Sequence, residues 1–149
     1  MIKDVLIVCH ANVCRSPAAE RLFRACLREQ KGPKAAAFQS AGLRARDGDD
    51  MDLVMQWLLA ERGVGVGKHQ SRRLTSRLVR SADLVLVTER RQVADVERIE
   101  PTARGKVYAL GNWENSDVID PHGLHEFAYR QSLELMERMV KGWLSRICQ

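Results

Sequence analysis

The sequence predicts a single α/β domain over residues 1–149, in which helices cover both faces of a four-stranded parallel sheet. Short apolar runs rich in β-branched residues alternate with segments of helical periodicity, the pattern of a parallel sheet with crossover helices. The 149 residues suit one hydrophobic core and are few for two. Hydrophobic residues at 45% and charged residues at 29% are typical of a globular protein.

The first strand and the first helix carry the strongest local signals. Residues 3–8 form an apolar run typical of a strand buried on both faces. Ser16 and Pro17 then indicate a helix start, with serine as the cap and proline in the first turn. Gly32 and Pro33 mark the expected end of this helix.

The remaining elements follow from apolar periodicity and from Gly and Pro punctuation. The expected strands span residues 35–41, 82–88 and 106–110. The expected helices span residues 51–62, 76–80, 89–99 and 124–147. In two of these helices, apolar residues at helical spacing are expected to face the core: Leu53, Val54, Trp57, Leu58 and Leu59 in the first, and Phe127, Met136, Met139, Val140, Trp143 and Ile147 in the last.

Composition favours an anionic ligand without indicating nucleic acid. The chain has 24 lysines and arginines against 19 acidic residues, a formal net charge of +5. The basic residues are spread among acidic ones, and the densest group, residues 72–80, has no interleaved aromatic side chains for stacking on bases. We therefore expect no nucleic-acid partner and a mild positive field that attracts anionic substrates.

The sequence indicates neither a membrane span nor a metal site. No apolar run approaches the roughly 20 residues that cross a bilayer, and the chain opens on a strand without a signal-peptide pattern. The four cysteines lack the spacing of a zinc site or a disulfide framework, and the histidines lack the spacing of metal ligands. We expect a cytoplasmic protein with no membrane insertion and no metal.

The segment CHANVCRSP joins the first strand to the first helix. Such a turn points backbone N–H groups and the positive end of the helix dipole into one small concavity, a natural oxyanion site. The loop residues expected to form this phosphate-binding loop are His10, Ala11, Asn12, Val13 and Cys14. Arg15 can clamp two phosphate oxygens, and the same positive field stabilises a thiolate at Cys9. The arrangement is therefore suited to attack of sulfur on phosphorus.

A thiolate that attacks a phosphate ester also needs a general acid for the leaving oxygen. Asp120 is the candidate, in the segment IDPHG before the last helix. Pro121 restricts the backbone of the aspartate and stiffens the loop. Taken alone, Asp-Pro is ordinary turn chemistry, and Cys9 could be a buried cysteine before a capped helix. Together the two features favour a catalytic pair.

These residues resemble the signature of the low-molecular-weight protein tyrosine phosphatases, in particular their bacterial branch. The signature is Cys-x5-Arg-Ser-Pro with an internal Asn and a second Cys, and it stands here as Cys9, Asn12, Cys14, Arg15, Ser16 and Pro17. Further segments match in the family's order: SAGL at 40–43, HQSRRL at 69–74, ADLVLV at 82–87, RGKV at 104–107 and DP at 120–121. The resemblance covers essentially the whole chain and implies the same four-stranded fold.

The resemblance implies a role for each matching position in the site. Cys9 would be the nucleophile that becomes phosphocysteine, and Arg15 would clamp the phosphate. Asp120 would act first as the acid and then as the base for the attacking water. Ser16 would supply a hydroxyl that stabilises the thiolate.

The resemblance also implies how the loop is supported and what it acts on. Asn12, tied to Ser40, would hold the shape of the loop. No metal or organic cofactor is implied. The implied substrate is a phosphotyrosine protein, with a bacterial tyrosine kinase that controls exopolysaccharide export as a partner, and inorganic phosphate or a similar oxyanion would bind in the site.

Two positions depart from the family's pattern, and one cysteine has two open roles. Ala11 replaces the usual glycine, which carries a steric cost if the backbone there needs a positive φ. His122 replaces the usual tyrosine at the pocket wall, and we expect it to be exposed rather than to pair with acidic groups of a substrate. Cys14 either packs within the loop or traps an oxidised Cys9 as a disulfide.

Two other functions are compatible with the same loop. A thioredoxin-coupled arsenate reductase has the same fold but relays a disulfide through mid-chain cysteines, and none lies between Cys26 and Cys148. A non-catalytic phosphate-binding module would lack the nucleophile or the acid, whereas Cys9 and Asp120 are both present. The sequence therefore favours a protein-tyrosine phosphatase.

Overall fold

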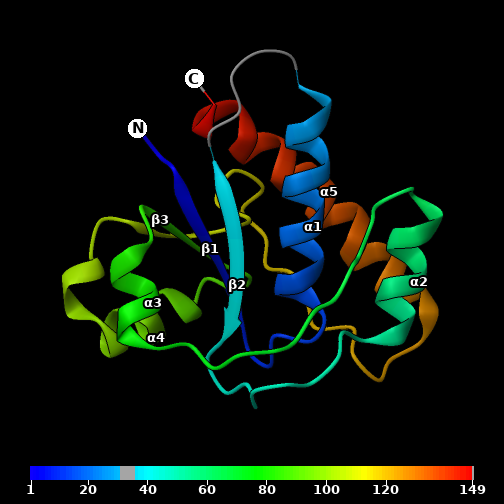
Figure 1. Cartoon of the computed structure of the whole chain (residues 1–149), viewed down its shortest axis with the longest axis horizontal. Coiled ribbons are helices and arrows are strands. Elements are labelled where there is room, and N and C mark those ends of the chain that lie inside the picture. The colour runs from blue at the N-terminus through cyan, green and yellow to red at the C-terminus, as the bar shows by residue number, and fades with distance from the viewer. Residues whose placement is uncertain (31–35, 149) are drawn as a thin grey trace.

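The computed structural model describes residues 1–30 and 36–148 and has four strands in one sheet (Figure 1). The strands are β1 (Asp4–Cys9), β2 (Ala37–Gly42), β3 (Leu84–Val87) and β4 (Val107–Ala109), in the spatial order β2-β1-β3-β4. Each neighbouring pair is parallel, so the carboxyl ends of the strands meet at one edge of the sheet. The predicted fold class is confirmed.

The helices cover both faces of this sheet. They are α1 (Arg15–Glu29), α2 (Leu53–Glu61), α3 (Ser76–Ser81), α4 (Gln92–Ile99) and α5 (Glu126–Ile147), with a short 3-10 helix, η1, at Pro101–Ala103. Side chains of α1, α2 and α5 form one core cluster, and side chains of α3 and α4 belong to another. Figure 1 shows the two groups of helices on opposite sides of the strands. Within the described residues, no helix is long and apolar enough to cross a membrane.

Strand β1 divides its side chains between the two cores. Val5 and Ile7 belong to the cluster completed by α1, α2 and α5, whereas Leu6 and Val8 belong to the cluster completed by α3 and α4. Successive residues of a strand point to opposite faces, and all four side chains are at most 3% exposed. This central strand is therefore held on both sides, and its carboxyl end is a fixed platform for the residues that follow.

The start of α1 differs from the expected one. The helix begins at Arg15, and Cys14, rather than Ser16, occupies the N-cap position. No side chain caps the helix there, and the Ser16 hydroxyl, in the first turn, lies 2.9 Å from the Cys9 sulfur. The expected helix end at residues 32–33 and the first residue of the expected strand 35–41 lie outside the described residues.

Three apolar residues expected in the core are exposed. Leu53 and Trp57 of α2 are 77% and 57% exposed, and Phe127 of α5 is 65% exposed. Each lies two residues from a buried neighbour, Met55 or Tyr129, and two residues turn a helix by about 200°. The helices therefore bury a narrower stripe than their apolar composition indicates.

Gly42, at the carboxyl end of β2, lets the chain pass close to the loop that follows β1. A Cβ atom at this position would lie 2.7 Å from the His10 carbonyl oxygen and 2.8 Å from the Asn12 nitrogen. Immediately after it, the Leu43 and Arg44 N–H groups donate to the carbonyl oxygens of Cys9 and His10, at 2.9 and 2.8 Å. Glycine is therefore required here by packing against backbone, which cannot rotate away.

We expect Gly42→Ala to lower the free energy of unfolding by about 1–3 kcal/mol, because the added methyl group overpacks against backbone. Urea denaturation measures this change. Gly65→Ala is the matched control, since a Cβ there meets no heavy atom within 4 Å. Equal stability of the two variants would contradict the account of the contact.

Candidate active site

The loop between β1 and α1 places the Cys9 sulfur against two polar groups. The Cys9 side chain is buried, and its sulfur accepts the Asn12 N–H at 3.3 Å and lies 2.9 Å from the Ser16 Oγ. The loop leads directly into the N-terminus of α1, whose unsatisfied N–H groups carry partial positive charge. The Cys9 sulfur therefore lies among hydrogen-bonding groups beside a positively polarised helix end, a setting suited to binding an oxyanion.

The left-handed backbone of this loop falls on Asn12, not on Ala11. Asn12 has φ of 57°, and Ala11 is not among the described residues with positive φ. Asparagine tolerates this conformation better than most residues, because its short polar side chain bonds locally. Alanine in place of the family's usual glycine therefore carries no strain from a positive φ.

The side chain of Asn12 ties the loop to three other segments. Its amide nitrogen donates to the hydroxyls of Ser16 and Ser40, at 2.8 and 3.0 Å, so the expected contact with Ser40 is present. Its amide oxygen accepts the Arg72 N–H at 3.0 Å. Its backbone carbonyl accepts a hydrogen bond of 2.7 Å from Nε2 of His69, whose pKa is lowered chiefly by burial. A single buried residue thus fixes the loop.

Glu20 extends this network away from the loop. The Ser40 hydroxyl donates to Oε1 of Glu20 at 2.6 Å, and the other oxygen, Oε2, pairs with Arg24 at 2.6 Å and Arg21 at 3.1 Å. The sequence reasoning did not identify Glu20, His69 or Arg72 as part of the site. In the sequence, segment 69–74 is only a matching motif, because its contacts with residue 12 join positions about sixty residues apart.

Arg15 is buried and held at one end. Its Nη1 donates to Oε2 of Glu89 at 2.6 Å and to the Val118 carbonyl at 2.8 Å. Its Nη2 lies 3.8 Å from Oδ2 of Asp120. Holding one nitrogen fixes the plane of the guanidinium, and a fixed fork loses less entropy when it binds two oxygens of an anion.

Glu89 is a site residue that sequence reasoning missed. It follows β3 by two residues, at the same sheet edge as Cys9, where the sequence predicts only the start of a helix. Burial alone would raise the pKa of Glu89, but hydrogen bonds from Arg15 and Arg91 outweigh it and lower the pKa below its ordinary value. The residue is therefore a stable anion that orients the Arg15 side chain.

Asp120, in the loop before α5, lies beside the Arg15 guanidinium. Its side chain is 45% exposed, and Oδ1 accepts the His122 N–H at 3.1 Å while Oδ2 faces Arg15. The structure therefore brings together, from segments more than a hundred residues apart, the three groups proposed from sequence: Cys9, Arg15 and Asp120. Their geometry places a carboxyl group beside the Arg15 guanidinium, at the end of the cysteine loop.

His122 is exposed as expected, and it also pairs with an unexpected partner. Its ring is 59% exposed, and Nδ1 lies 2.6 Å from Oδ2 of Asp52. The same Asp52 oxygen accepts the Tyr129 hydroxyl at 2.8 Å, while Oδ1 accepts the Met55 N–H as the N-cap of α2. The backbone N–H of Asp52 donates to the Val13 carbonyl at 2.8 Å. One buried carboxylate thus joins the cysteine loop, α2 and the Asp120 loop.

Cys14 is a buried free thiol with a strongly raised pKa. The causes are burial first and then the negative charges of Asp52 and Asp120. Its thiol therefore stays protonated at neutral pH and is a poor nucleophile. Cys9 and Cys14 are both reduced in the structure, and a protective disulfide between them stays a prediction.

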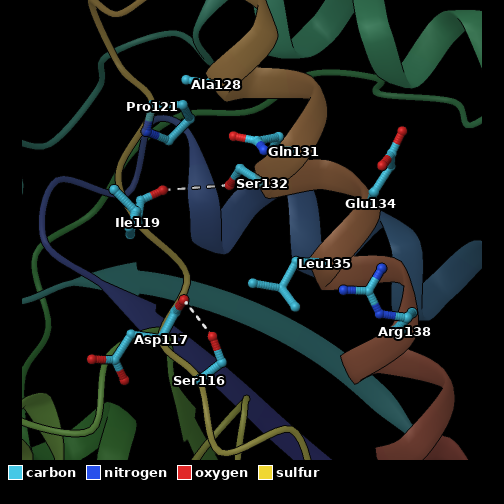
Figure 2. A pocket seen from close by; sticks show the side chains of 10 residues that line it. All are labelled: Ser116, Asp117, Ile119, Pro121, Ala128, Gln131, Ser132, Glu134, Leu135 and Arg138. Carbon is cyan, nitrogen blue, oxygen red and sulfur yellow. Dashed lines mark hydrogen bonds between the residues drawn. The ribbon is translucent and has the colours of Figure 1, made fainter.

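A concave pocket of about 450 Å³ lies beside the Asp120 loop but does not contain the cysteine site (Figure 2). Its walls are residues of the segment before α5 and of α5 itself: Ser116, Asp117, Ile119, Pro121, Ala128, Gln131, Ser132, Glu134, Leu135 and Arg138. The Ser132 hydroxyl donates to the Ile119 carbonyl at 3.5 Å and so ties this segment to α5.

Over residues 1–30 and 36–148, no three His, Cys, Asp or Glu side chains gather as a metal site would require.

Fold and site together define a class: α/β proteins with a buried cysteine at the end of the first strand and an arginine at the start of the helix that follows. A family model described as low molecular weight phosphotyrosine protein phosphatase matches residues 4–149. The chain belongs to this family, as the resemblance predicted.

Similar proteins span its whole length. The chain is 35% identical to the probable low molecular weight protein-tyrosine-phosphatase EpsP of Ralstonia nicotianae, over 99% of this chain and 97% of the relative. The crystal structure of the Erwinia amylovora tyrosine phosphatase AmsI has a TM-score of 0.92 and 32% identity, covering 100% of this chain and 95% of that one. Vibrio vulnificus Wzb in complex with benzylphosphonate has a TM-score of 0.91 and 30% identity, covering 98% and 99%. In that structure, a phosphonate ligand is bound to the same fold.

The carboxylate of Asp52 is expected to stabilise the fold in a pH-dependent way. Burial opposes its ionisation, but hydrogen bonds from Tyr129, Met55 and His122 outweigh burial, and the pKa of Asp52 is lowered. Its contribution is therefore fully present above the unfolded pKa of about 3.9 and is lost as pH falls through the lower folded pKa. We expect Asp52→Asn to cost about 1–2 kcal/mol at pH 7, and less below about pH 4.

Denaturant unfolding across pH measures this cost. Asp50→Asn is the control, because Asp50 is an exposed carboxylate of the same segment. A cost at Asp52 that stays constant down to the acid range would show that the charge has no part in it.

Proposed function

We propose that this chain hydrolyses phosphotyrosine in proteins through a phosphocysteine intermediate on Cys9. The observation that carries the proposal is the placement of the Cys9 sulfur, held by the Asn12 N–H and the Ser16 hydroxyl, with Arg15 and Asp120 gathered at the same loop. Family membership supports the reaction type, and the residue roles rest on this geometry.

In the first step, the phosphate dianion binds in the loop. Backbone N–H groups of residues 10–15 and the guanidinium of Arg15 hold its non-bridging oxygens. The Cys9 thiolate attacks phosphorus in line with the phenolic oxygen, so an S–P bond forms as the P–O bond breaks. Asp120, protonated, gives its proton to the leaving oxygen, and neutral tyrosine departs.

In the second step, water replaces the departed tyrosine. The Asp120 carboxylate takes a proton from the water as its oxygen attacks phosphorus, and the S–P bond breaks. Inorganic phosphate is released, and Cys9 leaves as a thiolate. A hydrogen bond of 2.9 Å between the Ser16 hydroxyl and the sulfur would stabilise that thiolate, with the hydroxyl as donor.

The proposed substrate is a phosphotyrosine-bearing protein in the cytoplasm. We extend this to an autophosphorylating bacterial tyrosine kinase of an exopolysaccharide export system as partner, which the bacterial branch of the family implies. The relatives named above are bacterial phosphatases similar to this chain over their whole length, which supports that extension.

The rival functions receive less support from the site. An arsenate reductase of this fold relays a disulfide through mid-chain cysteines, but apart from Cys9 and Cys14 of the loop the cysteines are Cys26, half-buried in α1, and Cys148, just past the end of α5. A phosphate-binding module without catalysis would have no use for a carboxyl group held beside Arg15.

Hydrolysis of an aryl phosphate and of a phosphotyrosine peptide between about pH 5 and 8 tests the proposal. We expect Cys9→Ser to abolish activity and Asp120→Ala to lower kcat on the peptide by about 100-fold or more, since a general acid contributes this much. Circular dichroism of both variants should match that of the parent protein, which separates loss of catalysis from loss of fold.

Asp117→Ala is the matched control for Asp120. Asp117 lies three residues earlier in the same segment, and its carboxylate bonds to Arg90 at the surface. Its loss should leave kcat close to that of the parent protein. Activity that survives Cys9→Ser, or a preference for a phosphoserine peptide, would overturn the proposed mechanism or substrate.

A further inference from the structure

A second concavity, of about 550 Å³, opens beside the cysteine loop on the α3–α4 side of the sheet edge. We call it the arginine groove. Its walls come from the ends of β1 and β2, the segment before α3, and α4: His10, Leu43, Arg44, Arg73, Leu74, Arg91, Gln92, Asp95, Arg98 and Ile99. His10 directly follows Cys9, so the groove begins one residue from the proposed nucleophile.

The groove carries unbalanced positive charge. Four of its residues are arginines, and Asp95 is its one acidic member. Asp95 is already engaged by Arg98 at 3.0 Å. Among the residues that the structure describes, no carboxylate lies within ion-pair distance of the exposed side chains of Arg44 or Arg73; Asp47 bonds only the backbone N–H of Arg73. These two guanidinium groups are therefore available to an anionic partner.

Backbone and side-chain contacts fix the groove relative to the cysteine loop. The Arg44 N–H donates to the His10 carbonyl at 2.8 Å. Glu89 bridges the two sites, because Oε2 accepts from Arg15 at 2.6 Å and Oε1 accepts from Arg91 at 3.0 Å. The Glu89 carboxylate thus lies between Arg15, the proposed phosphate clamp, and Arg91 of the groove.

Between its arginines, the groove has an apolar lining. Leu43, Leu74 and Ile99 contribute to its walls, and Ile99 is 38% exposed. Its lining residues include no Phe, Tyr or Trp, so it offers no large aromatic platform for stacking nucleic-acid bases. A cationic rim with aliphatic walls instead suits a peptide with both carboxylate and apolar side chains, because guanidinium forks bind carboxylates bidentately.

We propose that the arginine groove binds acidic residues of the substrate chain that lie next to the phosphotyrosine. An extended chain advances about 3.3–3.6 Å per residue, so residues within a few positions of the phosphotyrosine would lie over the groove. The groove then selects substrates with Asp or Glu beside the phosphotyrosine. This role rests on the proposed phosphatase activity of the neighbouring cysteine loop.

Two phosphotyrosine peptides test this selection, one with acidic and one with neutral flanking residues. The parent protein should have the higher kcat/KM on the acidic peptide. The double variant Arg44→Gln, Arg73→Gln should lower the acidic-to-neutral ratio of kcat/KM by about 3- to 10-fold at low ionic strength, and by less at high salt.

The matched control is Arg104→Gln, Arg138→Gln, which removes the same charge elsewhere. Arg104 precedes β4 at the opposite edge of the sheet, and Arg138 lies on α5 over the other face. This control should keep the ratio of the parent protein. Equal losses in both double variants would contradict selection by the groove. They would indicate only the general electrostatic field of a basic protein.

A binding measurement separates failure of the groove from failure of the proposed function. Fluorescence anisotropy of the labelled acidic phosphopeptide on Cys9→Ser, with and without the groove substitutions, requires no turnover. Weaker binding of about 3- to 10-fold on the groove variant supports the groove even if the parent hydrolyses no phosphotyrosine. Unchanged binding, or displacement of the peptide by a single-stranded oligonucleotide, would overturn it.

Discussion

The site depends on one buried residue in an unusual backbone conformation. Asn12, with φ of 57°, turns the chain so that its N–H points at the Cys9 sulfur. Its side chain then bonds to Ser16 and Ser40, and its amide oxygen accepts the Arg72 N–H. A left-handed residue persists only where its surroundings determine it, and here four segments of the chain do so. The loop is thus preorganised before a ligand arrives.

The sheet makes this convergence possible. The register pairs Cys9 with Gly42 across β1 and β2, and Val8 with Val87 across β1 and β3. Three chain segments therefore leave the sheet at the same level, one carrying Cys9 and another leading to Glu89. The fold supplies a rigid edge. The loops beyond it supply the charged groups: the cationic Arg15, Glu89, which orients it, and Asp120, which faces it. The groups proposed for catalysis are held in this way and would not need to reorganise during the reaction.

Local signals were enough to predict the fold and to propose the centre of the site. A β-branched run, a loop with Asn12 and the Arg15-Ser16-Pro17 helix start all lie within fifteen residues, so the loop could be recognised from sequence. The contacts of Glu89 and the pairing of His122 with Asp52 could not, because they join positions about seventy residues apart. The predicted core positions of Trp57 and Phe127 are wrong for a different reason, since both side chains are exposed. Periodicity identifies the apolar face of a helix but not how much of that face the neighbouring helices cover.

The central claim is that phosphate passes through the Cys9 sulfur, and a trapped intermediate tests it most directly. An aryl phosphate with a good leaving group needs little help from an acid, so the Asp120→Ala variant should form the phosphoenzyme and then hydrolyse it slowly. Rapid quenching and peptide mass spectrometry should find one phosphate on the peptide that contains Cys9, on sulfur. Phosphate on another residue, or turnover without any phosphoenzyme, would contradict the account.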